Sequence, residues 1–126
     1  LFLLTKYTLP TYTYEICGFD FKVTKTSGKR SQVVCNVSMK TGVAVCRFPR
    51  TAEDKRIYKS KYGDSLKRMN FCQTFQPENK FVLVLNFNDV KTEIFFEADD
   101  LFFYEMDTVL QEAKRVYHEE RFGDFK

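Results

Sequence analysis

The sequence predicts a mostly β domain that ends in one α-helix, and two observations carry this prediction. Several segments alternate apolar and polar residues, as half-buried strands do. Phe81–Phe87 is the most strand-like segment of the chain, because it is rich in Val and Phe. The period then changes. After Asp99, apolar residues recur at steps of three and four, which is typical of an amphipathic helix.

Seven segments are expected to be strands. Their ranges are Tyr14–Lys25, Gln32–Met39, Gly42–Phe48, Lys55–Tyr62, Ser65–Phe71, Phe81–Phe87 and Lys91–Ala98. Turn-forming residues separate most of them, which favours antiparallel pairing. We expect Gln32–Met39 and Gly42–Phe48 to form one tight hairpin, and Lys55–Tyr62 to be a polar strand with Ile57 as its apolar point.

The C-terminal helix is expected to cover the core. Asp99 or Asp100 can cap it, because a carboxylate accepts hydrogen bonds from the first free amides of a helix. The helix would run for about five turns. Its apolar stripe consists of Phe102, Met106, Val109, Ala113 and Val116, with Phe103, Leu110 and Tyr117 beside them.

A chain of 126 residues is long enough for one domain with its own core. We expect residues 13–126 to form this domain and residues 1–12 to be the end of a preceding element or a linker; alternatively, the segment before Pro10 packs across the domain's edge. Leu1 is not an initiator methionine and its neighbours lack signal-peptide features, so we expect an excised piece of a longer protein. No apolar run approaches the length of a membrane span.

The net charge of +3 is unevenly distributed. Residues 22–68 hold thirteen basic and three acidic side chains, whereas residues 69–126 hold six basic and twelve acidic ones. This division predicts a basic face and an acidic face, and an evenly solvated surface is the alternative.

No metal, other cofactor or enzyme activity is expected. The four cysteines occur singly, without a CxxC pair, and His118 is the one histidine, which does not match the ligand spacing of zinc sites. His118 also has no serine or cysteine at a defined spacing that would indicate a nucleophile. We expect the cysteines to be buried, reduced thiols; two disulfides in a secreted domain are the alternative.

Three motifs resemble the third lobe of FERM domains, which has the pleckstrin-homology-like superfold. Residues 9–12 (LPTY) are similar to the segment that leads into that lobe's first strand, and residues 36–43 are similar to one of its hairpins. Residues 65–71, followed by residues 81–85, resemble its fifth and sixth strands. The resemblance covers nearly the whole chain.

The sequence departs from the family pattern in two places. Thr13 stands where a glycine often follows the tyrosine, and residues 50–61 are longer and more basic than the usual turn. The resemblance implies two orthogonal antiparallel sheets of about seven strands, capped at one end by the C-terminal helix. Sheets alone would leave one end of the core in water, and the helix stripe is long enough to close it.

The resemblance also implies a binding module. Related lobes take the cytoplasmic tail peptide of a membrane protein, often of NPxY type, as an extra strand on the fifth strand and against the helix. Strand addition uses the free N–H and C=O groups of a sheet edge. The residues expected to bind such a peptide are Ser65, Leu66, Lys67, Arg68, Met69, Asn70, Met106 and Leu110.

A basic turn is a second expected site. Lys22, Lys25, Lys29 and Arg30 surround it and could hold an anionic phospholipid, since each basic residue near an anionic leaflet contributes about 1 kcal/mol. The expected location is therefore cytoplasmic, peripheral at the membrane or the cytoskeleton.

Other partners follow from the same interpretation. Sister lobes of the same chain are expected neighbours, and a purely structural lobe or a phosphoinositide-binding pleckstrin-homology domain are the alternatives. Nucleic acid is not expected, because the basic segment carries no RNP-like aromatic pair.

Overall fold

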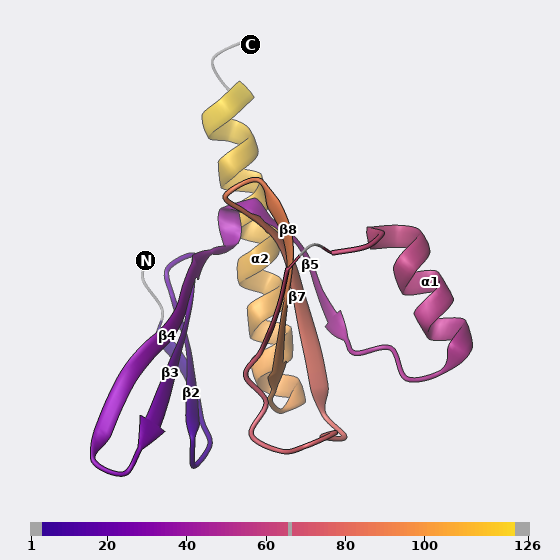
Figure 1. Cartoon of the computed structure of the whole chain (residues 1–126). Coiled ribbons are helices and arrows are strands. Elements are labelled where there is room, and N and C mark those ends of the chain that lie inside the picture. The colour runs from indigo at the N-terminus through magenta and orange to yellow at the C-terminus, as the bar shows by residue number, and fades with distance from the viewer. Residues whose placement is uncertain (1–3, 66, 123–126) are drawn as a thin grey trace.

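The computed structural model describes residues 4–65 and 67–122. This part of the chain forms eight strands in two four-stranded sheets, a long C-terminal helix and a shorter internal helix (Figure 1). The prediction of a mostly β chain that ends in one helix is confirmed. The strand count and the internal helix differ from the expectation.

The first sheet follows the chain order. Its strands are β1 (Leu4–Thr8), β2 (Tyr12–Cys17), β3 (Asp20–Ser27) and β4 (Arg30–Ser38), and all neighbours pair antiparallel. The two tight turns contain Gly18 and Gly28, whose φ angles of 60° and 62° favour glycine. Because side chains alternate, one face turns toward the core. That face carries Tyr14, Ile16, Phe21, Val23, Cys35 and Val37.

The segment before Pro10 packs as the edge of this sheet. Leu4–Thr8 pairs with β2, and the Tyr7 ring stacks on that of Tyr14 with centroids 6.4 Å apart. Of the two arrangements expected for the segment before Pro10, the structure therefore has the one in which it packs across the domain's edge.

The second sheet has the order β5-β7-β8-β6. Its strands are β5 (Gly42–Arg47), β6 (Lys67–Asn70), β7 (Lys80–Phe87) and β8 (Val90–Glu97). β6 pairs parallel to β8, with Arg68 opposite Glu93, so the expectation of purely antiparallel sheets is wrong for this pair. From Phe81 to Leu85, β7 is buried on both faces, which explains the unbroken apolar run at these positions.

The expected hairpin between Gln32–Met39 and Gly42–Phe48 is wrong. β4 pairs with β3 and β5 pairs with β7, so the two segments belong to different sheets. A 3₁₀ turn over Met39–Thr41 joins them. A Cβ at Gly42 would collide with the buried Leu110 side chain, so glycine lets the chain change sheets directly against the C-terminal helix.

The expected strand Lys55–Tyr62 is also wrong, because it lies in helix α1 (Ala52–Tyr62). Thr51 caps this helix by accepting a 3.0 Å hydrogen bond from the amide of Asp54, and Gly63 follows its last turn with φ 70°. Cap residues and early acids therefore outweigh the weak alternation of the segment.

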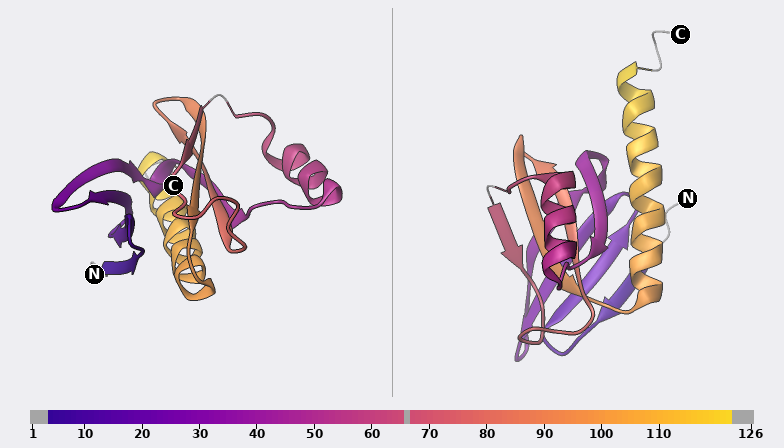
Figure 2. Two further views of the ribbon diagram at one scale, coloured as in Figure 1. Left: turned by 60° about the horizontal axis from the view of Figure 1, so that its bottom comes forward. Right: turned by 90° about the vertical axis from the view of Figure 1, so that its right-hand side faces the viewer.

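Helix α2 (Asp100–Phe122) closes one side of the core. Asp99 caps it, since its Oδ1 accepts a 2.8 Å hydrogen bond from the amide of Phe102. α2 packs against β1, β5 and the 3₁₀ turn, and Figure 2 shows it along one side of both sheets. Its fully covered residues are Phe102, Met106, Leu110 and Ala113. Within the described ranges, no helix is long and apolar enough to cross a membrane.

Candidate functional site

The expected peptide edge and the C-terminal helix lie apart. β6 forms one edge of the second sheet, whereas α2 packs against β5 at the opposite edge. A peptide added to β6 would therefore not reach α2, and the expected groove does not form. In addition, Met106 and Leu110 are completely buried, so their side chains are not available to a ligand.

The other residues expected at this edge have separate roles. Ser65 donates a hydrogen bond to Glu93, and Arg68 Nε lies 3.0 Å from the same carboxylate. Met69 packs partly against the core, and Asn70 accepts a 3.0 Å hydrogen bond from the amide of Cys72. Lys67 Nζ lies 5.9 Å from the ring centroid of Phe87. Leu66, the remaining residue of the expected set, lies outside the described residues.

The four residues expected to bind lipid do not form one compact pocket. Lys22 lies on the outer face of the first sheet, 3.9 Å from Glu15. Lys25 is three positions further along β3, and this odd step turns its side chain to the other face. Lys29 and Arg30 lie at the β3–β4 turn, about 20 Å along the strand from Lys22.

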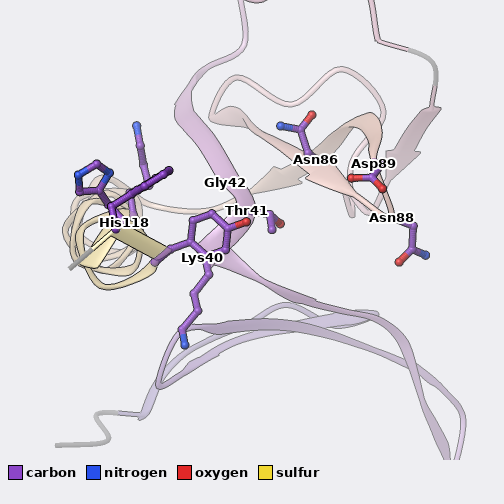
Figure 3. A pocket seen from close by; sticks show the side chains of 10 residues that line it. Lys40, Thr41, Gly42, Asn86, Asn88, Asp89 and His118 are labelled. Atoms are coloured by element: carbon purple, nitrogen blue, oxygen red, sulfur yellow. The ribbon is translucent and has the colours of Figure 1, made fainter. Parts of the chain in front are cut away.

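One cavity, of about 690 Å³, has many polar and charged side chains in its lining (Figure 3). Its walls come from the 3₁₀ turn, the β7–β8 turn and the C-terminal half of α2. The two ammonium groups in it have partners: Lys40 Nζ lies 2.9 Å from Glu120, and Lys114 Nζ donates to the carbonyl oxygen of Val43 at 3.0 Å. Among the described residues, no hydrogen bond joins His118 to a hydroxyl, thiol or carboxylate, and its ring lies beside that of Phe122 with centroids 4.9 Å apart.

A second cavity, of about 390 Å³, lies between β1 and α2 and is mostly apolar. We call it the β1–α2 groove. It is lined by Leu4, Thr5, Tyr104, Glu105, Thr108 and Val109. In the described chain, β1 pairs on one side alone, with β2, so its other edge offers unpaired backbone groups beside this groove.

Exposed apolar side chains gather at this groove. Leu4 is 58% exposed and Tyr104 is 59% exposed, although both are large and apolar. Sequence reasoning missed this site, because Leu4 was assigned to a preceding element and Tyr104 falls outside the core stripe. The available signal was Leu101, one turn before Tyr104 on α2 and also exposed, which gives the helix a second apolar face.

A third cavity, of about 450 Å³, lies between α1 and the outer face of the second sheet. We call it the α1 cleft. It is lined by Phe48, Pro49, Lys55, Tyr58, Lys59, Gly63, Asp64, Arg68, Lys80, Glu93 and Phe95. Basic residues from the positively charged part of the sequence, residues 22–68, lie in this cleft together with Lys80 from β7.

Glu93 is the buried acid of the α1 cleft. Burial raises its pKa, but hydrogen bonds from Ser65, Tyr58 and Arg68 lower it, and the net pKa lies below the ordinary value. The phenol of Tyr58 has a raised pKa because of burial and its hydrogen bond to Glu93. Glu93 is therefore a charged, satisfied carboxylate, and not a proton donor near neutral pH.

Comparisons with known proteins identify no relative: no protein-family model, curated protein or solved structure matches this chain. Within residues 4–65 and 67–122, no three His, Cys, Asp or Glu side chains gather so that they could hold a metal ion.

Proposed function

We propose that the domain is a non-enzymatic protein-interaction module that takes a short peptide as an extra strand along β1. The observation that carries this proposal is the apolar β1–α2 groove directly beside an unpaired strand edge. Backbone groups of β1 would supply affinity, and the groove would select apolar peptide side chains. A cytoplasmic tail peptide of a membrane protein, as the FERM resemblance implies, is the proposed ligand.

The course of β1 and α2 supports a groove that is long enough for several peptide residues. The Tyr7 ring lies 5.9 Å from that of Phe102, and Leu4 lines the same cavity as Thr108 and Val109. The strand and the first half of the helix therefore run side by side in opposite directions. Six helical residues cover about 9 Å, which matches three strand residues at about 10 Å.

The fold is consistent with this function. Two sheets share one core and a C-terminal helix covers its open side, which supports a pleckstrin-homology-like architecture as part of the proposal. In this chain the proposed binding edge is β1, instead of the Ser65–Phe71 segment that the FERM resemblance implies.

The test is a titration of isotope-labelled domain with a pool of NPxY-type peptides, read by amide shifts. We expect shifts at residues 4–8 and 101–109. Tyr104→Ala should weaken binding about tenfold, or about 1.4 kcal/mol, because a central aromatic contact is lost. Phe75→Ala is the matched control, since Phe75 is 89% exposed and lies outside the groove. Shifts confined to residues 67–70 would contradict the proposal.

Peripheral docking on an anionic membrane is a second candidate function. Phe75 projects from the loop between β6 and β7, and this loop is tied to Thr11, whose amide donates a 2.6 Å hydrogen bond to Gln73 Oε1. The loop and the β3–β4 turn with Lys29 and Arg30 lie at the same end of the molecule (Figure 1, Figure 2). An exposed aromatic ring at the same end of a molecule as cationic side chains is suited to a lipid interface.

Sedimentation with phosphatidylserine vesicles tests this candidate. Phe75→Ser and the pair Lys29→Glu/Arg30→Glu should each weaken salt-sensitive binding, because one removes interfacial burial and the other reverses charge. Lys61→Glu is the control on a different surface. Equal effects of all three changes would contradict docking through this end.

A further inference from the structure

Helix α1 has no apolar face of its own. None of its residues is buried, and its contact with the sheet is through the partly buried rings of Tyr58 and Tyr62. Figure 1 shows α1 to one side of the second sheet. The α1 cleft is lined by residues from both α1 and this sheet. At about 450 Å³ the cleft is within the usual size of a small-ligand site, about 300–1,000 Å³.

The α1 cleft has an excess of positive charge that comes from three elements. Its charged lining residues are Lys55, Lys59, Arg68, Lys80, Asp64 and Glu93, an excess of two cations over anions. Asp64 lies 3.6 Å from Lys59, and Glu93 is paired with Arg68. Among the described residues, Lys55 and Lys80 have no carboxylate within ion-pair distance, so they account for the excess.

Lys80 lies on an aromatic floor. Its Nζ is 4.0 Å from the ring centroid of Phe48 and 4.7 Å from that of Phe95, and these two rings meet edge to face at 5.6 Å. The rings hold the ammonium group in place and remove water from one side of it, which strengthens its attraction to an anion. Lys55 and Lys80 also line an adjoining opening of about 200 Å³ together with Arg50.

We propose that the α1 cleft binds a phosphate monoester group. Such a group carries close to two negative charges and three acceptor oxygens, which matches an excess of two cations that approach from α1 and β7. A carboxylate offers one charge and two oxygens. The aromatic floor would accommodate the organic part of the ester. A soluble phosphate ester and a lipid headgroup share this chemistry.

The first test uses phenyl phosphate as the soluble probe and benzoate as the singly charged comparison, with amide shifts as the readout. We expect phenyl phosphate to shift the amides of Lys55, Lys59 and Lys80 and to bind about tenfold more tightly than benzoate. Phosphatidic acid vesicles present the same monoester in a lipid, and phosphatidylglycerol vesicles carry charge without it. Binding of phenyl phosphate alone indicates a soluble ligand, and preference for phosphatidic acid indicates a headgroup.

Matched variants make the test specific. Lys55→Gln/Lys80→Gln should weaken phenyl phosphate binding about tenfold or more, because both unpaired cations are removed. Arg56→Gln changes the same charge on the same helix but lies outside the cleft, so it should change binding less than about twofold. If the Lys80 change disturbs folding, Lys55→Gln alone replaces the double variant in this test, because Lys55 is exposed.

Three results would overturn the proposal: no amide shifts at low salt, equal weakening by Arg56→Gln, or equal binding to the two kinds of vesicle without any effect of phenyl phosphate. Tyr104→Ala should leave phenyl phosphate binding unchanged. The proposal for the α1 cleft can therefore fail independently of the proposed peptide function.

Discussion

The phenol oxygen of Tyr58 lies 2.5 Å from Oε2 of Glu93 and donates a hydrogen bond to it. This contact joins α1 to β8 through two residues that are 35 positions apart in the chain. Because α1 has no buried residue, this hydrogen bond contributes a larger part of the free energy that keeps the helix folded against the sheet than it would in a helix with an apolar stripe.

Tyr58→Phe should loosen α1 while the rest of the domain stays folded. The lost hydrogen bond to a charged group should cost about 1–2 kcal/mol locally, at a partly exposed position. Hydrogen exchange of the α1 amides should therefore accelerate, with little change for β7. Tyr62→Phe is the control, because no described residue accepts a hydrogen bond from the Tyr62 hydroxyl. Equal acceleration in both variants would contradict this role for Tyr58.

The stability of the domain should depend on the charge of Glu93. Its folded-state pKa lies below the ordinary value of 4.5, because the hydrogen bonds from Ser65, Tyr58 and Arg68 outweigh burial. The contribution is therefore fully present above pH 4.5 and is lost as the pH falls through the lower folded-state pKa.

Urea unfolding of wild type and Glu93→Gln between neutral pH and pH about 3 measures this dependence. The wild type should lose its advantage over the variant as the pH falls below 4.5. A difference between the two proteins that is constant with pH would show that the Glu93 charge does not contribute.

Tyr14→Phe should destabilise the whole domain. The Tyr14 hydroxyl donates to the carbonyl oxygen of Phe71 at 2.5 Å and accepts from the amide of Glu97 at 3.3 Å, so it connects the first sheet to the second. Loss of both bonds should cost about 1–3 kcal/mol of unfolding free energy, measured by urea titration. Tyr12→Phe, whose ring lies against Phe71, is the control and should cost less.

Cys17 should be the reactive thiol of the folded protein. All four cysteines are free, and Cys17 is the exposed one. Burial raises the pKa of Cys35, Cys46 and Cys72 to about 11, which leaves about one thiolate in a thousand at pH 8. Alkylation followed by mass spectrometry should show one fast site, which Cys17→Ser removes. Several equally fast sites in the folded protein would contradict this prediction.

The local patterns of the sequence predicted much of the secondary structure. Residues 14–25, expected as one strand, are extended but form β2 and β3 with a turn at Gly18 between them, and the apolar segment Phe81–Phe87 lies in β7. The expected helix after Asp99 is α2, and four residues of its expected face are buried. These elements were predictable because each buries a regular set of its own side chains, so its apolar residues recur with the same period as the buried positions.

The errors arise where the local pattern is absent or where it does not identify the neighbouring element. Lys55–Tyr62 buries none of its residues in α1, so no hydrophobic period exists there and the caps carry the signal instead. The segment from Gln32 to Phe48 has a strand pattern on both sides of its turn, and the pattern does not say which strand is the neighbour. The expected peptide residues were joined by the FERM resemblance, which implies a strand beside the helix, but β6 and α2 lie at opposite edges of the second sheet. The expected lipid residues were grouped by nearness in sequence, and the first sheet spreads them over two faces and a turn.

The sequence by itself determined which segments bury one face, and hence the mostly β composition and the closing C-terminal helix. The tertiary structure decided the partners: β5 crosses to the second sheet, β6 lies parallel to β8 at the edge away from α2, and β1 leaves an open edge beside α2. The physical reason is that burial of a side chain follows the local period, whereas strand order depends on packing between residues far apart in the chain. Both proposed sites arise from that second kind of contact.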